Sequence, residues 1–231
     1  MQQDPVLERV KTRATIQDLV YQQLRNALIN GDFDPDQALT IQSLADLFGT
    51  SHMPVREALR RLAAENALLI ARSGSARVPP VTRERLDDLC QARVAVEGMA
   101  AELGIQRMSK DDIAALNAIE HQHVAAANKG DVYAMLVCNR DFHFAIYRAS
   151  GSNVLVQLID TLWLRFGPYM RMLSTHVRPR VEQGSGEPYV RQHRLVLTAI
   201  DAGDVAQARA ELERDIMFSW DLLKELCTES A

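Results

Sequence analysis

Cysteine is scarce in this sequence, and the three that occur are far apart. Cys90, Cys138 and Cys227 include no closely spaced pair. A small secreted domain held by disulfides needs an even set of cysteines, and a structural zinc knuckle needs pairs at short spacing. The sequence favours neither class, and we expect a protein of the reducing cytoplasm.

Long apolar stretches and an excess of one charge are also missing. Asp4 and Glu8 interrupt the region where a secretory signal needs an apolar segment, and no run approaches the roughly 18 residues of a membrane span. The net charge is −4, and residues 1–80 hold nine basic and nine acidic groups. We expect a soluble protein without a membrane partner, and not one that coats nucleic acid non-specifically.

Three short helices are predicted near the N-terminus. Apolar residues recur at helical spacing over residues 15–30, and Gly31 supplies a stop. A second helix is predicted from the capping residue Thr40 to Gly49. A third is predicted to begin near Pro54, because the fixed φ of proline suits the first turn. Two short helices joined by a tight turn predict a helix-turn-helix.

The third helix carries the local excess of positive charge. Residues 49–80 hold five arginines but only two acidic residues. Apolar residues recur at i, i+3, i+4 and i+7 from Val55, so Arg56 and Arg60 point outward together. Guanidinium groups placed there suit guanine or phosphate in a major groove. A merely solvated helix is the alternative, but a predicted hairpin at residues 68–78, around Ser73-Gly74, favours a winged DNA-binding domain.

Beyond Pro79-Pro80 the periodicity is helical throughout. We predict a mainly α fold, in which a winged helix-turn-helix (residues 10–78) and a linker (79–82) precede an all-α antiparallel bundle of six or seven helices (83–228). The latter would bind an effector and dimerise. A mobile loop is predicted at residues 178–188, which hold two prolines and two glycines. The predicted helices are residues 83–103, 110–128, 132–149, 154–175, 188–202 and 205–227.

Ligand-type side chains are spaced so that they meet inside this bundle. Asn139 and His143 lie four residues apart and share a helix face. His193 and Asp215 each lie eleven residues from Asp204, so antiparallel packing about that turn puts them level. The four side chains predict a divalent-metal site, and an empty cavity lined by hydrogen-bonding groups is equally consistent with them. Three further histidines of this half are expected to be solvated: His121, His123 and His176.

The N-terminal motif resembles a known family. Pro54-Val55-Arg56-Glu57-Ala58-Leu59, with Arg61-Leu62 after it, resembles the GntR family of bacterial regulators over about residues 15–80. His52 and Met53 stand where the family usually has Arg and Thr, and Asp36 replaces a usual turn glycine. The resemblance implies a set of DNA-contacting positions: Gln42, Ser51, His52, Pro54, Arg56 and, at the wing tip, Gly74.

The C-terminal half resembles the FadR C-terminal domain subfamily. The resemblance covers residues 83–228 and rests on Arg93 with Glu97, on Phe142-His143, and on His193 followed by Ala202-Gly203-Asp204. It implies a divalent ion held by an Asp or Asn and three His, with a carboxylate effector completing the shell. Asp215 stands at the third His position. We expect zinc, although Ni²⁺, Mn²⁺ and Mg²⁺ also fit. Arg93 would contact an acidic effector, or form a helix-surface ion pair with Glu97.

These observations predict a homodimeric regulator that binds double-stranded operator DNA. It would repress a metabolic operon until a small carboxylate or sugar acid releases it. Two alternatives remain: a metal-sensing repressor, in which the ion is the signal, and a metal-dependent enzyme that activates water. No acid–base partner accompanies the predicted ligands, so we expect no catalysis.

Overall fold

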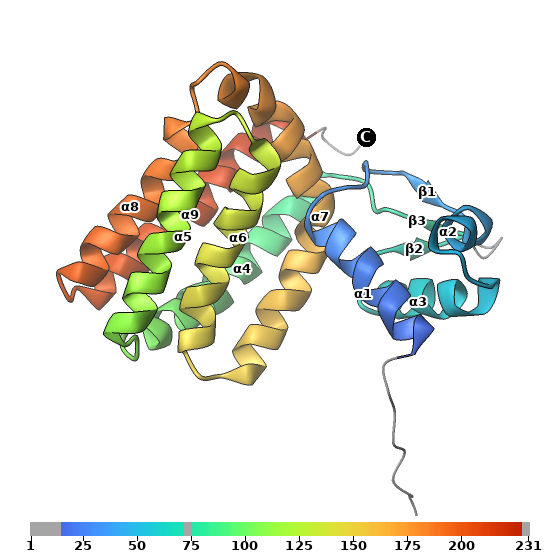
Figure 1. Ribbon diagram of the computed structural model, residues 1–231, viewed down its shortest axis with the longest axis horizontal. Helices are drawn as coiled ribbons and strands as arrows, with labels where there is room; N and C mark the ends of the chain where they lie inside the picture. The colour runs from blue at the N-terminus through green and yellow to red at the C-terminus, as the bar shows by residue number, and fades with distance from the viewer. Residues whose placement is uncertain (1–14, 72–74, 228–231) are drawn as a thin grey trace, which may run out of the picture.

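The computed structural model describes residues 15–71 and 75–227, which form an N-terminal head and a helical bundle (Figure 1). The head holds three helices and a small sheet. Its elements in chain order are α1 (Ile16–Ile29), β1 (Ala38–Leu39), α2 (Ile41–Phe48), α3 (His52–Ala64), β2 (Leu69–Ile70) and β3 (Ala76–Arg77).

Local signals set the ends of the head helices. Thr15 and Asp18 form a capping box at the start of α1, which satisfies two otherwise orphan backbone N–H groups. Thr40 caps α2, and Gly49 ends it with a left-handed φ of 60°. α3 begins at His52, two residues before Pro54, so the start predicted at the proline is slightly late.

The sheet has the order β1-β3-β2, with both pairs antiparallel. Strand β1 was not predicted, because two residues show no alternation. Asp36, just before it, has a φ of 64°, the left-handed conformation for which glycine is usual. The Arg77 Nε–H donates to the Asp36 carbonyl oxygen at 2.9 Å and holds this turn against β3. Gly74 lies outside the described residues.

The bundle contains the six predicted helices. They are α4 (Arg83–Ile105), α5 (Lys110–Asn128), α6 (Val132–Ala149), α7 (Asn153–Glu182), α8 (Glu187–Asp201) and α9 (Val205–Leu226). The predicted mobile loop at residues 178–188 is wrong at both ends, because α7 continues through Pro179 to Glu182 and α8 begins at Glu187. Val177 and Val181 lie one turn apart and are each 1% exposed, and their burial extends the helix beyond the proline.

None of the helices described is both long and apolar enough to cross a membrane.

The head packs on the bundle through α1 and α7, which lie side by side in Figure 1. Leu164 of α7 is fully buried within the apolar core of the head. A Cβ at Gly167 would overlap the carbonyl oxygen of Leu28, so only glycine permits this approach. Ion pairs from Arg25 to Asp160 and from Arg171 to Asp34 flank the contact. Helix α7 therefore belongs to both parts.

Candidate functional site

The N-terminal end of α3 forms an exposed polar edge on the head. Ser51, His52 and Arg56 are exposed there, and Pro54 is half-buried. The His52 Nε2–H donates to Gln42 Oε1 at 2.9 Å, so the side chain predicted on the preceding helix ties α2 to α3. The Gln42 amide nitrogen donates to the Asp46 carboxylate at 2.9 and 3.0 Å, so both polar atoms of this side chain are engaged within the head.

The two outward arginines of α3 differ in their surroundings. Arg60 pairs with Glu57 at 3.3 Å, and its side chain is 68% exposed. Arg56 has no ion pair within residues 15–71 and 75–227, so none of the described acidic groups compensates its charge. An exposed guanidinium without an acidic partner can pair with a DNA phosphate directly, because no ion pair within the protein has to be broken first.

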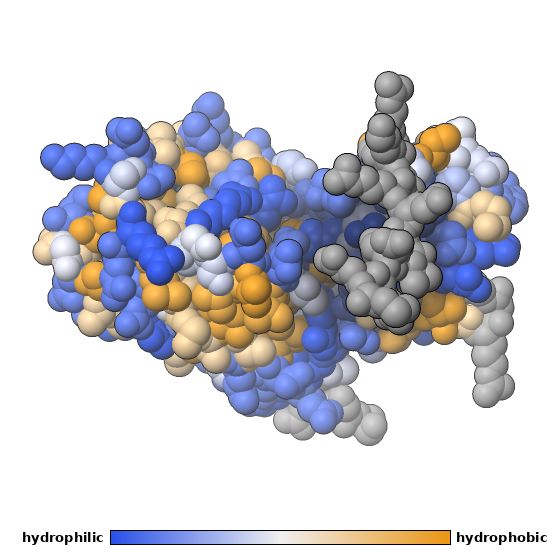
Figure 2. All heavy atoms as spheres, turned by 90° about the horizontal axis from the view of Figure 1, so that it is seen from below, coloured by the Kyte–Doolittle hydropathy of each residue, from blue (hydrophilic) through white to orange (hydrophobic). Residues whose placement is uncertain are grey.

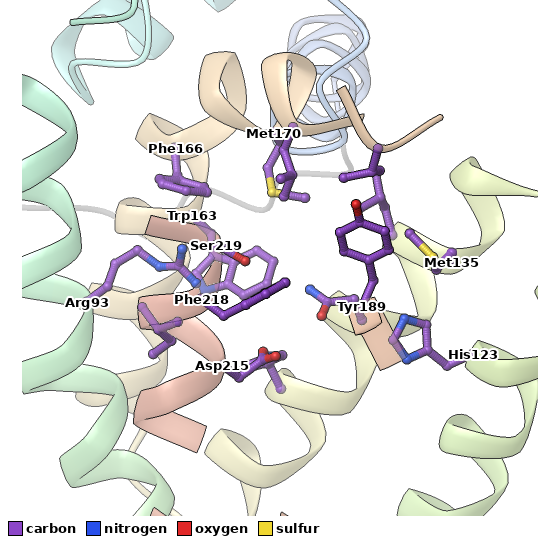
Figure 3. A pocket seen from close by; sticks show the side chains of 16 residues that line it. Arg93, His123, Met135, Trp163, Phe166, Met170, Tyr189, Asp215, Phe218 and Ser219 are labelled. Carbon is purple, nitrogen blue, oxygen red and sulfur yellow. The ribbon is translucent and has the colours of Figure 1, made fainter. Parts of the chain in front are cut away.

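A cavity of about 50 Å³ lies inside the bundle (Figure 3). Arg93 reaches it from α4, and His123 faces it from the opposite side. A bound water needs about 10–15 Å³, so this space suits an ion with a few waters, or a very small organic acid. Trp163, Phe166 and Met170, all on α7, supply an apolar wall.

Three of the four predicted metal ligands meet beside this cavity. His143 Nε2 lies 2.8 Å from Asp215 Oδ2, and His193 Nε2 lies 3.8 Å from the same oxygen. The ligand atoms of the three buried residues all lie within 4.8 Å of one another. Asn139, one turn before His143, lines the same cavity. The register that the sequence predicts about Asp204 therefore agrees with the structure.

The hydrogen bonds of these histidines direct Nε2 of each ring toward the Asp215 carboxylate. The Tyr147 hydroxyl donates to Glu97 at 2.5 Å, so its oxygen accepts from His143 Nδ1–H at 2.9 Å. His143 Nε2 therefore faces Asp215 Oδ2 at 2.8 Å and donates a hydrogen bond to that carboxylate. His193 Nδ1–H donates to Glu120 at 3.2 Å, and its Nε2 is buried without a hydrogen-bond partner in the described chain. Two imidazole nitrogens and a carboxylate fit a divalent cation.

Ionisation also suits a cation here. Burial lowers the pKa of His193, despite the hydrogen bond to Glu120, so the ring is neutral near pH 7. Burial acts to raise the pKa of Asp215, but the hydrogen bond and charge of His143 and the charge of His193 lower it overall. The site therefore offers a cation the Asp215 carboxylate and the neutral His193 ring, and a bound cation would replace the proton that His143 shares with Asp215.

Arg93 forms the predicted ion pair with Glu97, although not at the surface, and it also lines the cavity. Its Nε and Nη2 bind Glu97 at 2.6 and 3.3 Å, and the two residues are 4% and 0% exposed. The guanidinium lies over the rings of Trp163 and Phe166, with its carbon 4.8 and 4.5 Å from their centroids. Its Nη1 makes no hydrogen bond with the described residues and remains for a ligand in the cavity.

Two buried polar residues beside His193 were missed. His123 was expected to be solvated, which is wrong: it is 1% exposed, and Glu120 is 3% exposed. Both lie on the side of α5 that faces the bundle, where apolar periodicity gives no signal for a polar residue. The i, i+3 spacing of a carboxylate and a histidine could have indicated them. His121 is exposed as expected, whereas His176 lies inside α7 and is half-buried.

The comparisons with known proteins agree with this architecture. Residues 16–78 match the family described as bacterial regulatory proteins, gntR family, and residues 88–217 match the FCD domain. This chain belongs to the GntR family. Its FCD domain is the bundle that holds the cavity and the histidines. It is a DNA-binding transcription regulator and not an enzyme, so the metal-dependent enzyme alternative is wrong.

Relatives extend over most of this GntR-family chain. It is 33% identical over 181 residues to the HTH-type transcriptional regulator McbR of Escherichia coli K12, covering 78% of this chain and 80% of McbR. It is 28% identical to the transcriptional repressor GlaR of the same organism, over 84% and 89% of the two chains. The solved structure of E. coli McbR/YncC superposes with a TM-score of 0.85 at 29% identity, over 93% of this chain and 99% of that one.

Proposed function

We propose that this GntR-family regulator is a homodimeric repressor of a metabolic operon and that a small carboxylate releases it from operator DNA. The observation that carries the proposal is Arg93, whose buried guanidinium keeps Nη1 free toward the cavity beside the predicted metal ligands. A guanidinium binds carboxylates through paired N–H groups. GlaR is itself named a repressor, which supports the direction of control.

The metal ligands would complete the acid site. Asn139, His143, His193 and Asp215 would hold a divalent ion, most simply Zn²⁺ given the nitrogen donors. When bound, the ion supplies positive charge that attracts carboxylate oxygens. The size of the cavity favours a small acid, and a sugar acid would require Tyr189 and Phe218 to move outward.

A dimer is supported by apolar side chains that the bundle leaves exposed. Figure 2 shows apolar residues gathered on one of its faces. Met99, Val154, Leu158 and Met217 are each at least 45% exposed, and a second copy would shield side chains of this kind from water. Two heads on one dimer would place two α3 helices in neighbouring half-sites of an operator.

The experiment is a fluorescence-anisotropy titration of the full chain on a duplex from its own promoter region. Protein stripped by a chelator and reloaded with Zn²⁺ is tested against a panel of small carboxylates. We expect at least one acid to weaken operator binding by about tenfold, the low end of typical allosteric coupling. The response should vanish without Zn²⁺ and in Arg93→Gln, while the exposed control Arg178→Gln keeps it.

The other outcomes are equally informative. Release by chelator alone, with no acid, would identify the metal-sensing repressor instead. Acid release that persists in Arg93→Gln would contradict the binding site proposed here. No response to any small acid, with or without metal, would contradict release by a carboxylate.

Coupling between cavity and head is proposed to run through α7. Trp163, Phe166 and Met170 line the cavity, while Leu164 and Gly167 on the same helix contact the head. A ligand that shifts this segment biases the position of the heads. We expect Gly167→Ala to reduce the acid response from about tenfold to below about twofold, because the added methyl separates α1 from α7.

Calorimetry of acid binding separates this effect from damage to the cavity. Gly167→Ala should bind the acid within about threefold of the wild type. Gly98→Ala is the control, since a Cβ in that helical glycine meets only the flexible tips of Glu213 and Arg209. An unchanged operator response in Gly167→Ala would exclude α7 as the connection.

A further inference from the structure

A second set of ligand-type atoms lies on the opposite edge of the His193 ring. Glu120 Oε2 lies 3.2 Å from His193 Nδ1 and 3.4 Å from His123 Nδ1. These ligand atoms all lie within 4.8 Å of one another, and the three residues are each buried. Only His193 belongs to both sets. It faces the first set with Nε2 and the second set with Nδ1.

Two atoms of this second set lack hydrogen bonds. His123 Nδ1 and Glu120 Oε1 are buried without a partner in the part of the chain that is described. Buried polar atoms are nearly always paired, so each orphan needs an explanation. Arg194 Nε lies 3.6 Å from Glu120 Oε1, so this oxygen has an exposed charge partner but no hydrogen bond within the described residues.

Stacking fixes the orientation of the shared ring. Phe142 lies parallel to His193 at 7°, with the centroids 3.9 Å apart, and His123 packs beside it at 4.6 Å. The His193 plane is therefore held while Nδ1 points to Glu120 and Nε2 points to Asp215. One imidazole is therefore shared by the two sets of ligand atoms.

We propose that Glu120, His123 and His193 Nδ1 form a second divalent-cation site, filled as an alternative to the first. Two imidazoles and one carboxylate suit Zn²⁺ or a similar borderline cation. An imidazole ring with one proton has a single lone pair to offer a cation. An ion on Nε2 leaves that proton on Nδ1, where it donates to Glu120; an ion on Nδ1 leaves it on Nε2, facing Asp215. One ion is therefore bound at a time.

The second site has its own route from solvent. A surface groove of about 420 Å³ between α5 and α8 is lined by Glu120, His121 and Arg194. Of the second set only Glu120 lines this groove, whereas His123 and members of the first set border the inner cavity that Arg93 lines. An ion can thus reach Glu120 without passing the acid site. The alternation rests on the metal site of the proposed function, whereas the existence of the second site does not.

The test is Zn²⁺ uptake by chelator-stripped, tag-free full-length protein, measured by mass spectrometry after equilibrium dialysis. We expect about one equivalent in the wild type, in His143→Ala and in His123→Ala, because each single variant retains one site. The double variant His123→Ala/His143→Ala, and His193→Ala alone, should bind less than about a tenth of an equivalent. His121→Ala, an exposed neighbour on the same helix, is the matched control.

Each deviation has a definite meaning. Loss of Zn²⁺ in His143→Ala would overturn the second site, provided that the variant keeps its helical circular dichroism. Loss in His123→Ala with retention in His143→Ala would leave the second site standing and remove the first, and with it the metal of the proposed function. Two equivalents in the wild type would overturn the alternation, and none would overturn both sites. Glu120→Gln and Asp215→Ala replace any histidine variant that does not fold.

Discussion

Replacing Arg56 with alanine is expected to weaken specific operator binding by about 30-fold or more. An arginine on a recognition helix contributes about 1–3 kcal/mol, and a dimer would lose two of them. Arg56 is exposed on α3, and no described acidic group neutralises it. Anisotropy on the operator duplex at fixed salt measures the change, and helical circular dichroism should not alter.

Arg61→Ala is the matched control on the same helix. The Arg61 guanidinium lies 3.7 Å from the Tyr21 ring centroid and pairs with Asp18 and Glu65, so it belongs to the packing of the head. Its removal should lower stability slightly and change operator affinity by less than about threefold. Equal losses in both variants would show non-specific charge attraction. Full affinity in Arg56→Ala would remove α3 as the reading element.

The sequence predicts most of the head because its boundaries are local. Thr15, Thr40 and Gly49 act through hydrogen bonds and φ values within a few residues, and each marks a helix end in the structure. Strand β1 escapes prediction because it exists only through pairing with β3, a contact between residues about forty positions apart. The same applies to α7 beyond Pro179, where burial against other helices outweighs a local stop signal.

The site is predictable where geometry follows from a turn, and not where it depends on packing. Equal distances from Asp204 place His193 level with Asp215, as the structure shows. The sequence does not indicate that Glu120 and His123 are buried. Polar residues are usually exposed, so their positions in the helical pattern are assigned to the solvent side. The burial of Arg93 is hidden in the same way, since its spacing to Glu97 equally suits an exposed pair.

Because Arg93 and Glu97 form a buried pair, Glu97→Ala is expected to lower the free energy of unfolding by about 3–5 kcal/mol. Removing one partner of a buried ion pair leaves an uncompensated charge, which costs this much. Glu97 accepts from both Arg93 and Tyr147, so the variant also orphans a buried hydroxyl. For a chain of this size the melting temperature should fall by about 6–20 °C, as calorimetry would show.

Glu182→Ala supplies the control, because Arg178 and Glu182 form an i, i+4 pair with side chains 50% and 54% exposed. Exposed pairs contribute at most about 1 kcal/mol, so this variant should barely change the melting temperature. If the two variants lose equal stability, Arg93 is not held as a buried charge.

Acetate then tests whether Arg93 binds free carboxylates. The space left by the Glu97 side chain lies against the guanidinium, so acetate should raise the melting temperature of Glu97→Ala by several degrees more than that of the wild type. Acetamide, which has the same shape without the charge, should not. Such a rescue would show that the cavity arginine accepts a carboxylate from solution, which release by an organic acid requires. Equal responses to acetate and acetamide would mean that the loss is one of packing, and that Arg93 does not select an acid.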